Sequence, residues 1–386
     1  MTTVATHLEM SVQVTLSTSA LRVIETEPQT DPRWLRFVVA HPNGSVYHHP
    51  AWLKALDKEY RQQGVHLACE DTRGQFLAVL PMLYTQGLPV NLGGSLTARR
   101  LSSLPRTPQA GTLSTDPRAT REILQAAVSR VRQDPNIQLQ VKTQGAELDG
   151  LVDGVVCAPW RMSYLLQLPG KPDEVFRVHK SDDRARIKWA VNKAKRLGVH
   201  VRPAETEAEL EEWYMLYLET MRRNVVPPRS YRFFAALWEL LRPQGMMELL
   251  LAEERGVRLR RIVAGSLFML FGTTVSYAFN GSRGADLALR PNDLIQWQAI
   301  NDACKRGFKC FDFGEVPDGH FDLAKFKMKW GAQPTPLYRY YFTALREANS
   351  NSVKSRGYGT RLSEEAWRRL PLKATAWLGD RIYSYL

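Results

Sequence analysis

Cysteine is scarce in this chain of 386 residues, and its four cysteines lie far apart in the sequence. They are Cys69, Cys157, Cys304 and Cys310, and no two of them form a C-x-x-C pair. A disulfide scaffold and a cysteine-based zinc site are therefore not expected, and the composition fits a reducing compartment. The histidines also lack metal-ligand spacing, so the sequence predicts no metal site.

Several other common signals are missing. The chain has no G-x-S-x-G motif and no Walker-type loop, which argues against a serine hydrolase and against a P-loop NTPase. The first 24 residues contain no basic segment followed by an apolar core, so no secretory signal is expected and we predict a cytoplasmic protein.

One uncharged stretch is long enough to be weighed as a membrane span. Residues 262–282 contain no charged side chain, but Gly272, Thr273 and Thr274 lie at their centre. Small and polar residues at that place favour two buried strands joined by a tight turn over a helix in lipid.

The charge balance is strongly basic. Lysine and arginine number 52 against 39 acidic residues, a formal net charge of +13. The surplus favours a polyanionic partner such as nucleic acid, a phosphorylated substrate or an anionic lipid surface, and it says nothing about the fold. Hydrophobic residues make up 44% of the chain, which is enough for a folded protein with a substantial core.

The order of predicted elements indicates a mixed α+β fold in two halves. Helices are expected at 116–134, 184–197, 206–223, 229–242 and 293–306, and strands at 65–69, 76–84, 137–141, 163–168, 247–253, 308–313 and 337–343. We divide the chain into a leader or edge segment (1–30), a first domain (31–165), a second domain (166–346), and a linker with a helical tail broken at Pro371 (347–386).

The segment from Gly307 to Ala332 holds the main candidate for chemistry. The strand expected at its start ends at Gly314, which places Asp312 and Glu315 at the carboxyl end, where α/β sheets commonly bind ligands. A polar loop follows and leads to three further candidates. These are Lys327 and Lys329, which can neutralise an anion, and Trp330, which stacks on a ligand or packs. The alternative is that Asp312 only satisfies backbone donors and the lysines are solvated.

Three blocks carry a resemblance to a known family. Residues 294–314 read L-I-x-W-x-A-I-x-x-A-x-x-x-G-x-x-x-F-D-F-G, and residues 326–331 follow with F-K-x-x-W-G. Residues 184–198 read R-x-x-I-x-x-A-x-x-K-A-x-x-L-G, and residues 47–53 read Y-H-H-P-A-W-L. Together they resemble the Fem family of peptidoglycan-bridge aminoacyltransferases and their double-GNAT-fold relatives, which include exopolysaccharide-associated acetyltransferases.

The resemblance implies two tandem GNAT-like domains, each a mixed, mostly antiparallel sheet flanked by helices. It implies transfer of an acyl group to an amino group of a cell-envelope or polysaccharide precursor, with a lipid-linked acceptor among the alternatives. The donor substrate would be acyl-CoA, which we place first on the breadth of the family, or aminoacyl-tRNA. We expect no permanently bound cofactor and no DNA partner. A non-catalytic protein that binds tRNA or anionic lipid is the rival interpretation.

The sequence departs from the family pattern before the helix at 293–306. Ordinary GNAT enzymes cradle pyrophosphate there with a glycine-rich loop, whereas residues 289–293 read L-R-P-N-D. We expect Arg290 to supply an anion contact from its side chain and Asn292 or Asp293 to cap the helix. A plain capping turn with a solvated arginine stays open as the alternative.

Four more residues complete the candidate site. Arg184 and Lys188 belong to a helix with one apolar stripe and a cationic face, which suits a phosphate-rich donor or a lipid phosphate, or else is simply solvated. Tyr277 is expected to face Asp312 as a proton relay or packing residue, and Asn280 is a candidate substrate contact or a turn residue.

The tail carries Trp367, Trp377 and basic residues, and it either packs on the body or lies peripherally at the inner membrane face.

Overall fold

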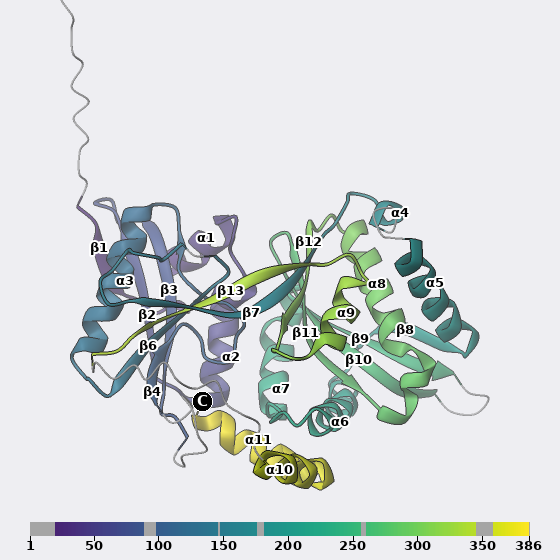
Figure 1. The fold of residues 1–386 in the computed structure, drawn as a ribbon. Helices are drawn as coiled ribbons and strands as arrows, with labels where there is room; N and C mark the ends of the chain where they lie inside the picture. Colours follow the sequence, from purple (N-terminus) through teal and green to yellow (C-terminus); the bar gives the residue numbers. More distant parts are fainter. Residues whose placement is uncertain are drawn as a thin grey trace, which may run out of the picture.

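In the computed structural model, residues 20–88, 98–145, 147–175, 181–255, 260–344 and 358–385 are described. Their strands form one mixed sheet in the order β1-β2-β3-β4-β6-β13-β7-β12-β11-β10-β9-β8, with β5 paired to β3. Figure 1 shows that the two ends of this sheet belong to two separate halves of the molecule. The predicted α+β class with a mostly antiparallel sheet is confirmed.

The first half is a sheet with helices on both faces. Its elements are β1 (Arg22–Glu25), α1 (Pro32–Ala40), the 3-10 turn η1 (Val46–His48), α2 (Pro50–Tyr60), β2 (Gly64–Glu70), β3 (Phe76–Thr85), β4 (Arg99–Ser102), β5 (Leu113–Ser114), α3 (Pro117–Arg132) and β6 (Ile137–Thr143). Helix α3 packs on one face of the sheet, while α1 and α2 pack on the other face over β2 and β3.

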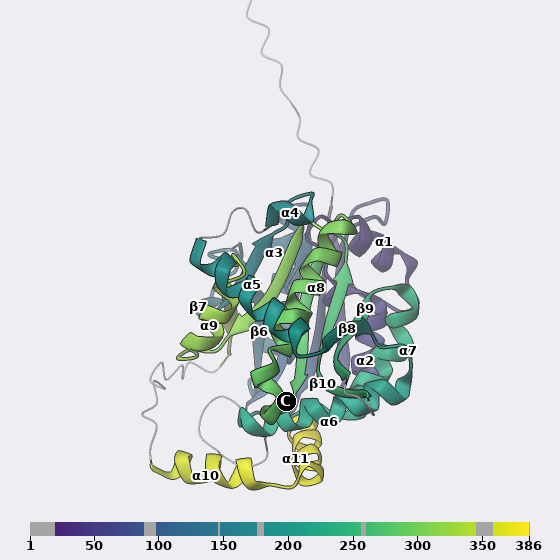
Figure 2. The ribbon, with the colours of Figure 1, turned by 90° about the vertical axis from the view of Figure 1, so that its right-hand side faces the viewer.

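The second half has the same layering. Its elements are β7 (Val156–Gln167), α4 (Pro172–Val175), α5 (Ser181–Arg196), β8 (Val199–Pro203), α6 (Glu207–Arg223), α7 (Tyr231–Leu240), η3 (Arg242–Gln244), β9 (Met247–Arg255), β10 (Arg260–Phe271), β11 (Thr274–Ser282), η4 (Gly284–Leu289), α8 (Pro291–Lys305), β12 (Cys310–Val316), α9 (Phe321–Met328) and β13 (Gln333–Phe342). Helices α5 and α8 cover one face, and α6 and α7 cover the opposite face (Figure 2).

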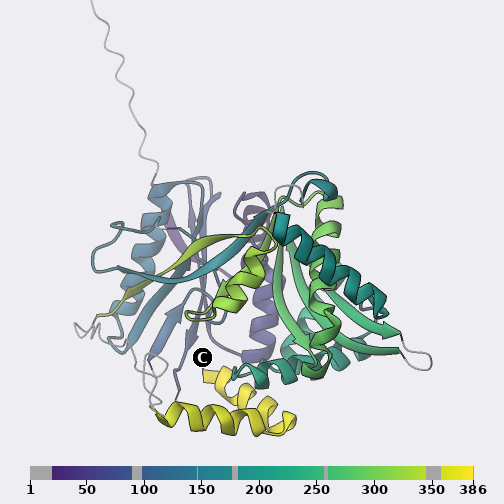
Figure 3. The ribbon, with the colours of Figure 1, turned by 45° about the vertical axis from the view of Figure 1, so that its right-hand side comes forward.

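Two long strands join the halves. Strand β7 pairs with β13 and then with β12, while β13 returns to pair with β6 of the first half. Figure 3 shows both strands crossing between the halves, with α9 beside them. The boundary that we predicted between residues 165 and 166 falls inside β7, so the domain division stays a prediction.

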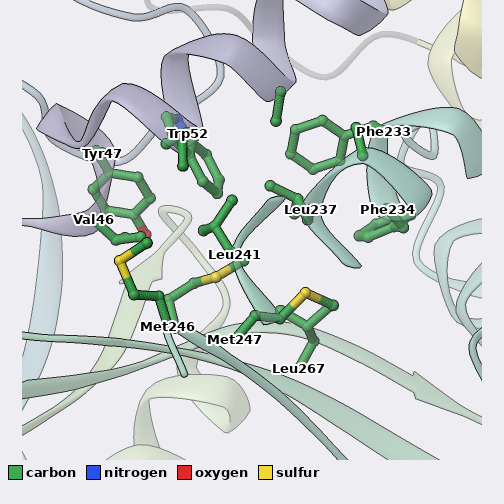
Figure 4. Close-up of a cluster of buried hydrophobic side chains, with 14 of the residues drawn as sticks. Val46, Tyr47, Trp52, Phe233, Phe234, Leu237, Leu241, Met246, Met247 and Leu267 are labelled. Carbon is green, nitrogen blue, oxygen red and sulfur yellow. The ribbon is translucent and has the colours of Figure 1, made fainter. Parts of the chain in front are cut away.

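A shared core also holds the halves together. Trp52 from α2 meets Phe233 from α7 edge-to-face at a ring-centroid distance of 5.7 Å. Figure 4 shows the side chains of η1 and α2 on one side of this cluster and those of α7 and the following strands on the other. Because large aromatic side chains of both halves are fully buried here, the cleft between the halves has a fixed base.

The structure corrects some predictions of secondary structure. Residues 321–328, predicted as part of a polar loop, form helix α9, and residues 32–40 form helix α1, for which we predicted no element. Helix α1 starts with an Asp31 side-chain cap and Pro32, a start signal that we did not use. Strand β12 does not end at Gly314 but continues to Val316 through an irregularity in its pairing with β7.

Other predictions are confirmed. The uncharged stretch forms the hairpin of β10 and β11, and no helix of the described segments is long and apolar enough to span a membrane. The tail forms α10 (Tyr358–Arg369) and α11 (Leu372–Tyr385) on either side of Pro371, and α11 packs against α6. Of the predicted leader, residues 1–19 lie outside the described residues, as do residues 347–357 of the predicted linker.

Close packing of α6 on the hairpin depends on a pair of glycines. Gly265 of β10 and Gly281 of β11 are register partners, and a Cβ atom at Gly281 would lie 2.6 Å from the Tyr217 backbone nitrogen. Because backbone atoms of α6 cannot give way as a side chain can, any side chain at residue 281 must displace the helix.

We predict that Gly281→Ala lowers the free energy of unfolding by about 3 kcal/mol, measured by urea denaturation. Gly170→Ala is the matched control, because no atom lies within 4 Å of a Cβ placed there. Equal stability of the two variants would contradict the close contact between α6 and β11.

Candidate active site

Strands β11 and β12 diverge in the middle of the second half. They pair in parallel over only three residues, 274–276 with 310–312, although β11 continues to Ser282 and β12 to Val316. Beyond the last pair, Ser276 with Asp312, the facing edges of the two strands separate. The sheet therefore offers unpaired backbone groups at the point where Asp312 lies.

Asp312 is buried, and the hydrogen bonds found for its carboxylate among the described residues all reach one of its two oxygens. Its side-chain oxygen Oδ1 accepts hydrogen bonds from Ser163 Oγ at 2.9 Å and from the Gly314 backbone N–H at 2.7 Å. No hydrogen bond to Oδ2 is found among the described residues, and the residue is 5% exposed. Burial raises the pKa of Asp312, and the two hydrogen bonds and the charge of Lys327 offset this only in part.

Lys327 and Glu315 lie next to Asp312. The buried Lys327 Nζ donates to the carbonyl oxygens of Gly314 at 2.8 Å and Glu315 at 3.0 Å, so the lysine holds the irregular turn of β12 in place. Burial lowers the pKa of Lys327 to about 8, although the nearby Asp312 and Glu315 oppose the shift. The Glu315 carboxylate pairs with Arg161 at 2.5 Å.

A cavity between the two halves lies next to β11. It has a volume of about 830 Å³, and its lining includes Tyr47 and His48 from the first half and Ser276 from β11. Ser276 is the register partner of Asp312, so both side chains project from the same face of the sheet, toward the first half. A substrate in the cavity would therefore approach Asp312 from the cleft between the halves.

Sequence reasoning missed several neighbours of Asp312. Tyr47 comes from the first half. Burial and then the charges of Asp312 and Glu315 raise its pKa, and the charge of Arg229 opposes them. The block at residues 47–53 could have identified Tyr47, but we used it only for the family resemblance. Ser163 and Arg161 lie on a strand in whose sequence nothing distinguishes them, and only the pairing of β7 with β12 brings them here.

Tyr277 lies away from Asp312. Ser276 rather than Tyr277 occupies the register position opposite Asp312, so the expectation that Tyr277 faces it is not met. The Tyr277 ring packs near Phe268 and Phe313, at centroid distances of 5.7 and 6.4 Å. The Tyr277 hydroxyl is buried beside Ser266, and this burial raises its pKa.

Trp330 packs within the core of the second half. Its side chain is fully buried in the cluster formed by α5, α8 and the sheet. Of the two predicted alternatives, stacking on a ligand and packing in the core, the structure therefore supports packing. Lys329 is not solvated, because its Nζ pairs with the buried Asp293 of α8. Residues 326–330 therefore fix α9 to α8, and only Lys327 points toward Asp312.

The start of α8 differs from our prediction. The N-cap residue is Arg290, in the left-handed conformation at φ 59°, and no side chain caps the helix. Asn292 and Asp293 lie inside the first turn, so the prediction that one of them is the cap was wrong. Pro291 contributes no N–H at this end, and the buried Asn292 Oδ1 has no hydrogen-bond partner among the described residues.

The basic helix α5 meets Arg290 at the surface. Arg184 and Lys188 are exposed on α5, as predicted for its cationic face. Trp189 is 49% exposed. The Arg290 guanidinium lies 5.1 Å from its ring centroid, and the Lys193 Nζ lies 5.3 Å from it. Arg290 and α5 thus share one cationic, aromatic surface. Asn280 lies apart from it on β11, where its Oδ1 accepts a hydrogen bond from Ser266 Oγ at 3.1 Å.

The cleft contains more cations than anions. Burial lowers the pKa of Lys142, and among its charged neighbours are Arg339, Glu315, Arg106 and Arg100. Arg100, Lys142 and Arg339 come from β4, β6 and β13, on the face of the first sheet that α3 does not cover. Buried nitrogens of Arg100, Arg106 and Arg339 lack hydrogen-bond partners among the described residues.

The described residues contain no group of three or more ligating side chains placed to hold a metal ion. All four cysteines are free.

Comparisons with known proteins agree on the fold. Residues 181–327 match the family model "Acetyltransferase (GNAT) domain". The chain superposes on the crystal structure of FemX with a TM-score of 0.62 and 16% identity, over 83% of this chain and 97% of FemX. No curated protein gives a significant sequence match.

Two further solved structures are similar over most of their length. The C-terminal domain of a putative lysylphosphatidylglycerol synthetase from Agrobacterium fabrum gives a TM-score of 0.51 and 10% identity, over 80% of this chain and 90% of that one. A tandem GNAT protein from the clavulanic acid biosynthesis pathway gives a TM-score of 0.50 and 9% identity, over 85% of this chain and 100% of that protein. At these identities the likeness establishes the fold, and it agrees with the resemblance seen in the sequence.

The pH dependence of stability tests the burial of Lys327. Its pKa is about 8 in the folded protein against 10.5 for an unperturbed lysine, so between these values the unfolded chain binds more protons. The native state therefore gains stability as pH rises from about 8 to about 10.5. We predict that the unfolding free energy of wild type minus that of Lys327→Met increases by up to about 3 kcal/mol across this range.

Urea denaturation at several pH values measures this difference. Lys325→Met is the matched control, because Lys325 lies on the same helix and is exposed. A difference between wild type and Lys327→Met that stays constant with pH would show that Lys327 titrates normally.

Proposed function

We propose that this chain, whose residues 181–327 match a GNAT domain and whose fold is similar to that of FemX, is an acyltransferase that transfers an acyl group from acyl-CoA to an amino group of a cell-envelope or polysaccharide precursor. The observation that supports this most is Asp312, a buried carboxylate where β11 and β12 diverge. One of its oxygens accepts two hydrogen bonds, and the other has no partner among the described residues. A carboxylate in this position can accept a proton from an attacking amine.

The proposed reaction forms an amide bond. The acceptor amine attacks the thioester carbonyl carbon, the C–S bond breaks, and CoA leaves as its thiolate. The proton lost by the nitrogen goes to Asp312 Oδ2, whose basicity is increased because burial raises the pKa of this carboxyl. Ser163 and Gly314 orient the carboxylate through Oδ1 and so leave the syn and anti lone pairs of Oδ2 for the substrate.

Neighbouring groups would stabilise the developing charges. Lys327 fixes the turn at Gly314 and places a positive charge near Asp312. Backbone N–H groups along the separated edges of β11 and β12 are suitable donors for the carbonyl oxygen, since no strand pairs with them there. Glu315 is held by Arg161, which makes it a candidate for orienting the acceptor rather than for proton transfer.

Acceptor and donor would enter from different sides. The cavity of about 830 Å³ between the halves is the proposed acceptor site, because Ser276, the register partner of Asp312, lines it. The donor would lie between the diverging strands with its phosphates near the start of α8, where Arg290 offers a side-chain contact in place of a glycine-rich loop. Arg184, Lys188 and Asn292 are the further candidates on this side.

Aminoacyl-tRNA is the second candidate donor. One observation favours it: the exposed Trp189 between two cations lies beside the start of α8 and suits a stacked base with its phosphates. An acceptor on a lipid, with the protein peripheral at a membrane, is compatible with the same chemistry.

We predict that Asp312→Asn keeps the fold and lowers the acyl-transfer rate by about 10²–10⁴-fold, since asparagine accepts the same hydrogen bonds and cannot take the proton. Release of CoA thiol from acetyl-CoA in the presence of amino sugars and envelope-precursor amines measures the rate. Asp318→Asn, in the exposed loop of the same segment, is the control. Full activity of Asp312→Asn would contradict the proposed base, and a protein inactive with every amine but still bound to tRNA or lipid would favour the non-catalytic alternative.

The donor can be identified by binding. We predict that acetyl-CoA raises the thermal midpoint of the protein and that Arg290→Gln weakens this effect severalfold, because a phosphate contact is removed. Charged tRNA is compared in parallel by filter binding. Stabilisation by aminoacyl-tRNA alone would reverse our order of donors.

A further inference from the structure

Helix α11 is held against the body by one of its faces. Thr375 and Gly379, which lie about one helical turn apart, are both buried. A Cβ atom at Gly379 would collide with the backbone oxygen of Pro228, so the helix lies directly on the segment before α7. The Tyr383 ring lies 6.4 Å from the Tyr60 ring of α2. These contacts fix the rotation of α11 about its own axis, so its opposite face points away from the body.

The opposite face carries a tryptophan between two cations. Lys373, Trp377 and Arg381 follow one another at intervals of four residues, and all three are exposed. Trp377 is 63% exposed, which is unusual for so large an apolar side chain. Because residues four apart on a helix are neighbours, the three side chains form one continuous surface, which we call the tail face.

The positive charge of the tail face is not compensated. Neither Lys373 nor Arg381 forms an ion pair among the described residues. The acids that lie nearest to the buried side of α11 are engaged elsewhere, because Asp380 and Glu59 both pair with Arg232 of α7. The tail face therefore presents two free positive charges beside an exposed indole ring.

Apolar side chains border the tail face on one side. Leu378 and Ile382, again four residues apart, are partly exposed although both are large and apolar. Beyond Arg381 the surface of α11 thus continues as an apolar strip. A helix with this distribution, fixed on one side and half apolar, half cationic on the other, is typical of attachment to a membrane surface.

The position of the tail makes this surface accessible. Figures 1 and 2 show α10 and α11 as an outer layer at one end of the molecule, below α6 and α7. Figure 2 also shows the axis of α10 running along that end. A flat surface can therefore meet the tail without meeting the walls of the cleft.

The chemistry of the tail face selects its partner. An indole ring has an apolar body and one polar N–H, which suits the boundary between lipid headgroups and acyl chains. Lysine and arginine reach headgroup phosphates with their charged ends while their stems stay on the apolar surface. A stable protein partner would need about 800 Å² on each side with an apolar centre, whereas here the exposed ring lies between two cations.

We propose that the tail face of α11 binds the surface of membranes that contain anionic phospholipid. The binding itself does not rest on the proposed acyl transfer. If that function holds, the contact would keep the cleft close to an acceptor carried by a lipid.

Vesicle flotation of the full chain tests the proposal. We expect the protein to float with vesicles of phosphatidylglycerol and phosphatidylcholine in equal parts and to stay behind with phosphatidylcholine alone. Trp377→Ala should weaken binding at least tenfold. Lys373→Gln together with Arg381→Gln should also weaken it at least tenfold, since each basic residue near an anionic surface contributes about fivefold. Because all three side chains are exposed, the thermal midpoint should not change.

Two matched controls separate the tail face from general effects. Phe321→Ala removes another exposed aromatic ring, and Arg36→Gln together with Lys54→Gln removes the same charge from exposed positions of α1 and α2. Both control proteins should bind vesicles like the wild type. An equal loss in the charge control would show attraction by net charge alone. Unchanged binding of both tail-face variants would place the lipid contact elsewhere, and either result would overturn the proposal.

Light scattering examines a second copy of the chain as the occupant. A mass that rises with protein concentration, falls back with Trp377→Ala and is accompanied by no vesicle binding would assign the tail face to self-association and overturn the proposal. Vesicle binding that depends on Trp377, with no amine acylated, would leave the lipid surface standing and count against the proposed function. Acylation without vesicle binding would do the reverse.

Discussion

The hydrogen-bonded pairing of β7 with β13 is the constraint on which the molecule depends. Each strand leaves its own half and pairs into the other, so two sheets become one and the cleft between them has a fixed width. The same pairing places Ser163 against Asp312, because β7 is the neighbour of both β13 and β12. The strand β7, which joins the halves, therefore also orients the Asp312 carboxylate.

Burial sets the electrostatic character of the cleft. Asp312 and Lys327 are both buried, and their pKa values shift in opposite directions, up for the acid and down for the base. Both shifts favour the neutral forms, and a raised pKa suits Asp312, the group that is proposed to take a proton from the substrate. Around them, the cations of β4, β6 and β13 find few acidic partners. A cleft of this kind is suited to an anionic molecule that carries an amine.

Much of the fold could be predicted from local patterns. The β10–β11 hairpin, the helices α5 to α8 and the break at Pro371 all follow from periodicity and from turn residues that act over a few positions. Helix α9 was missed because Pro317 and Gly319 before it indicate a turn, and its eight residues are too few for a clear period.

The site was predictable only in part, and the reason is physical. Asp312, Glu315 and Lys327 lie within 16 residues of one another, so a single segment identifies them. Ser163, Tyr47 and Arg229 reach the same cleft from three distant segments, and only strand pairing and core packing bring them there. Conversely, Trp330 is close to Lys327 in sequence but is buried in the core, because it lies in the turn that follows α9 and not on the helix itself.

Hydrogen–deuterium exchange with acetyl-CoA tests the central claim most directly, that the acyl donor lies between the diverging strands beside Asp312. The account predicts slower exchange of backbone amides at residues 277–282 and 313–316 and at the start of α8 when the donor is bound. Protection confined to other parts of the chain, with these amides unchanged, would contradict it.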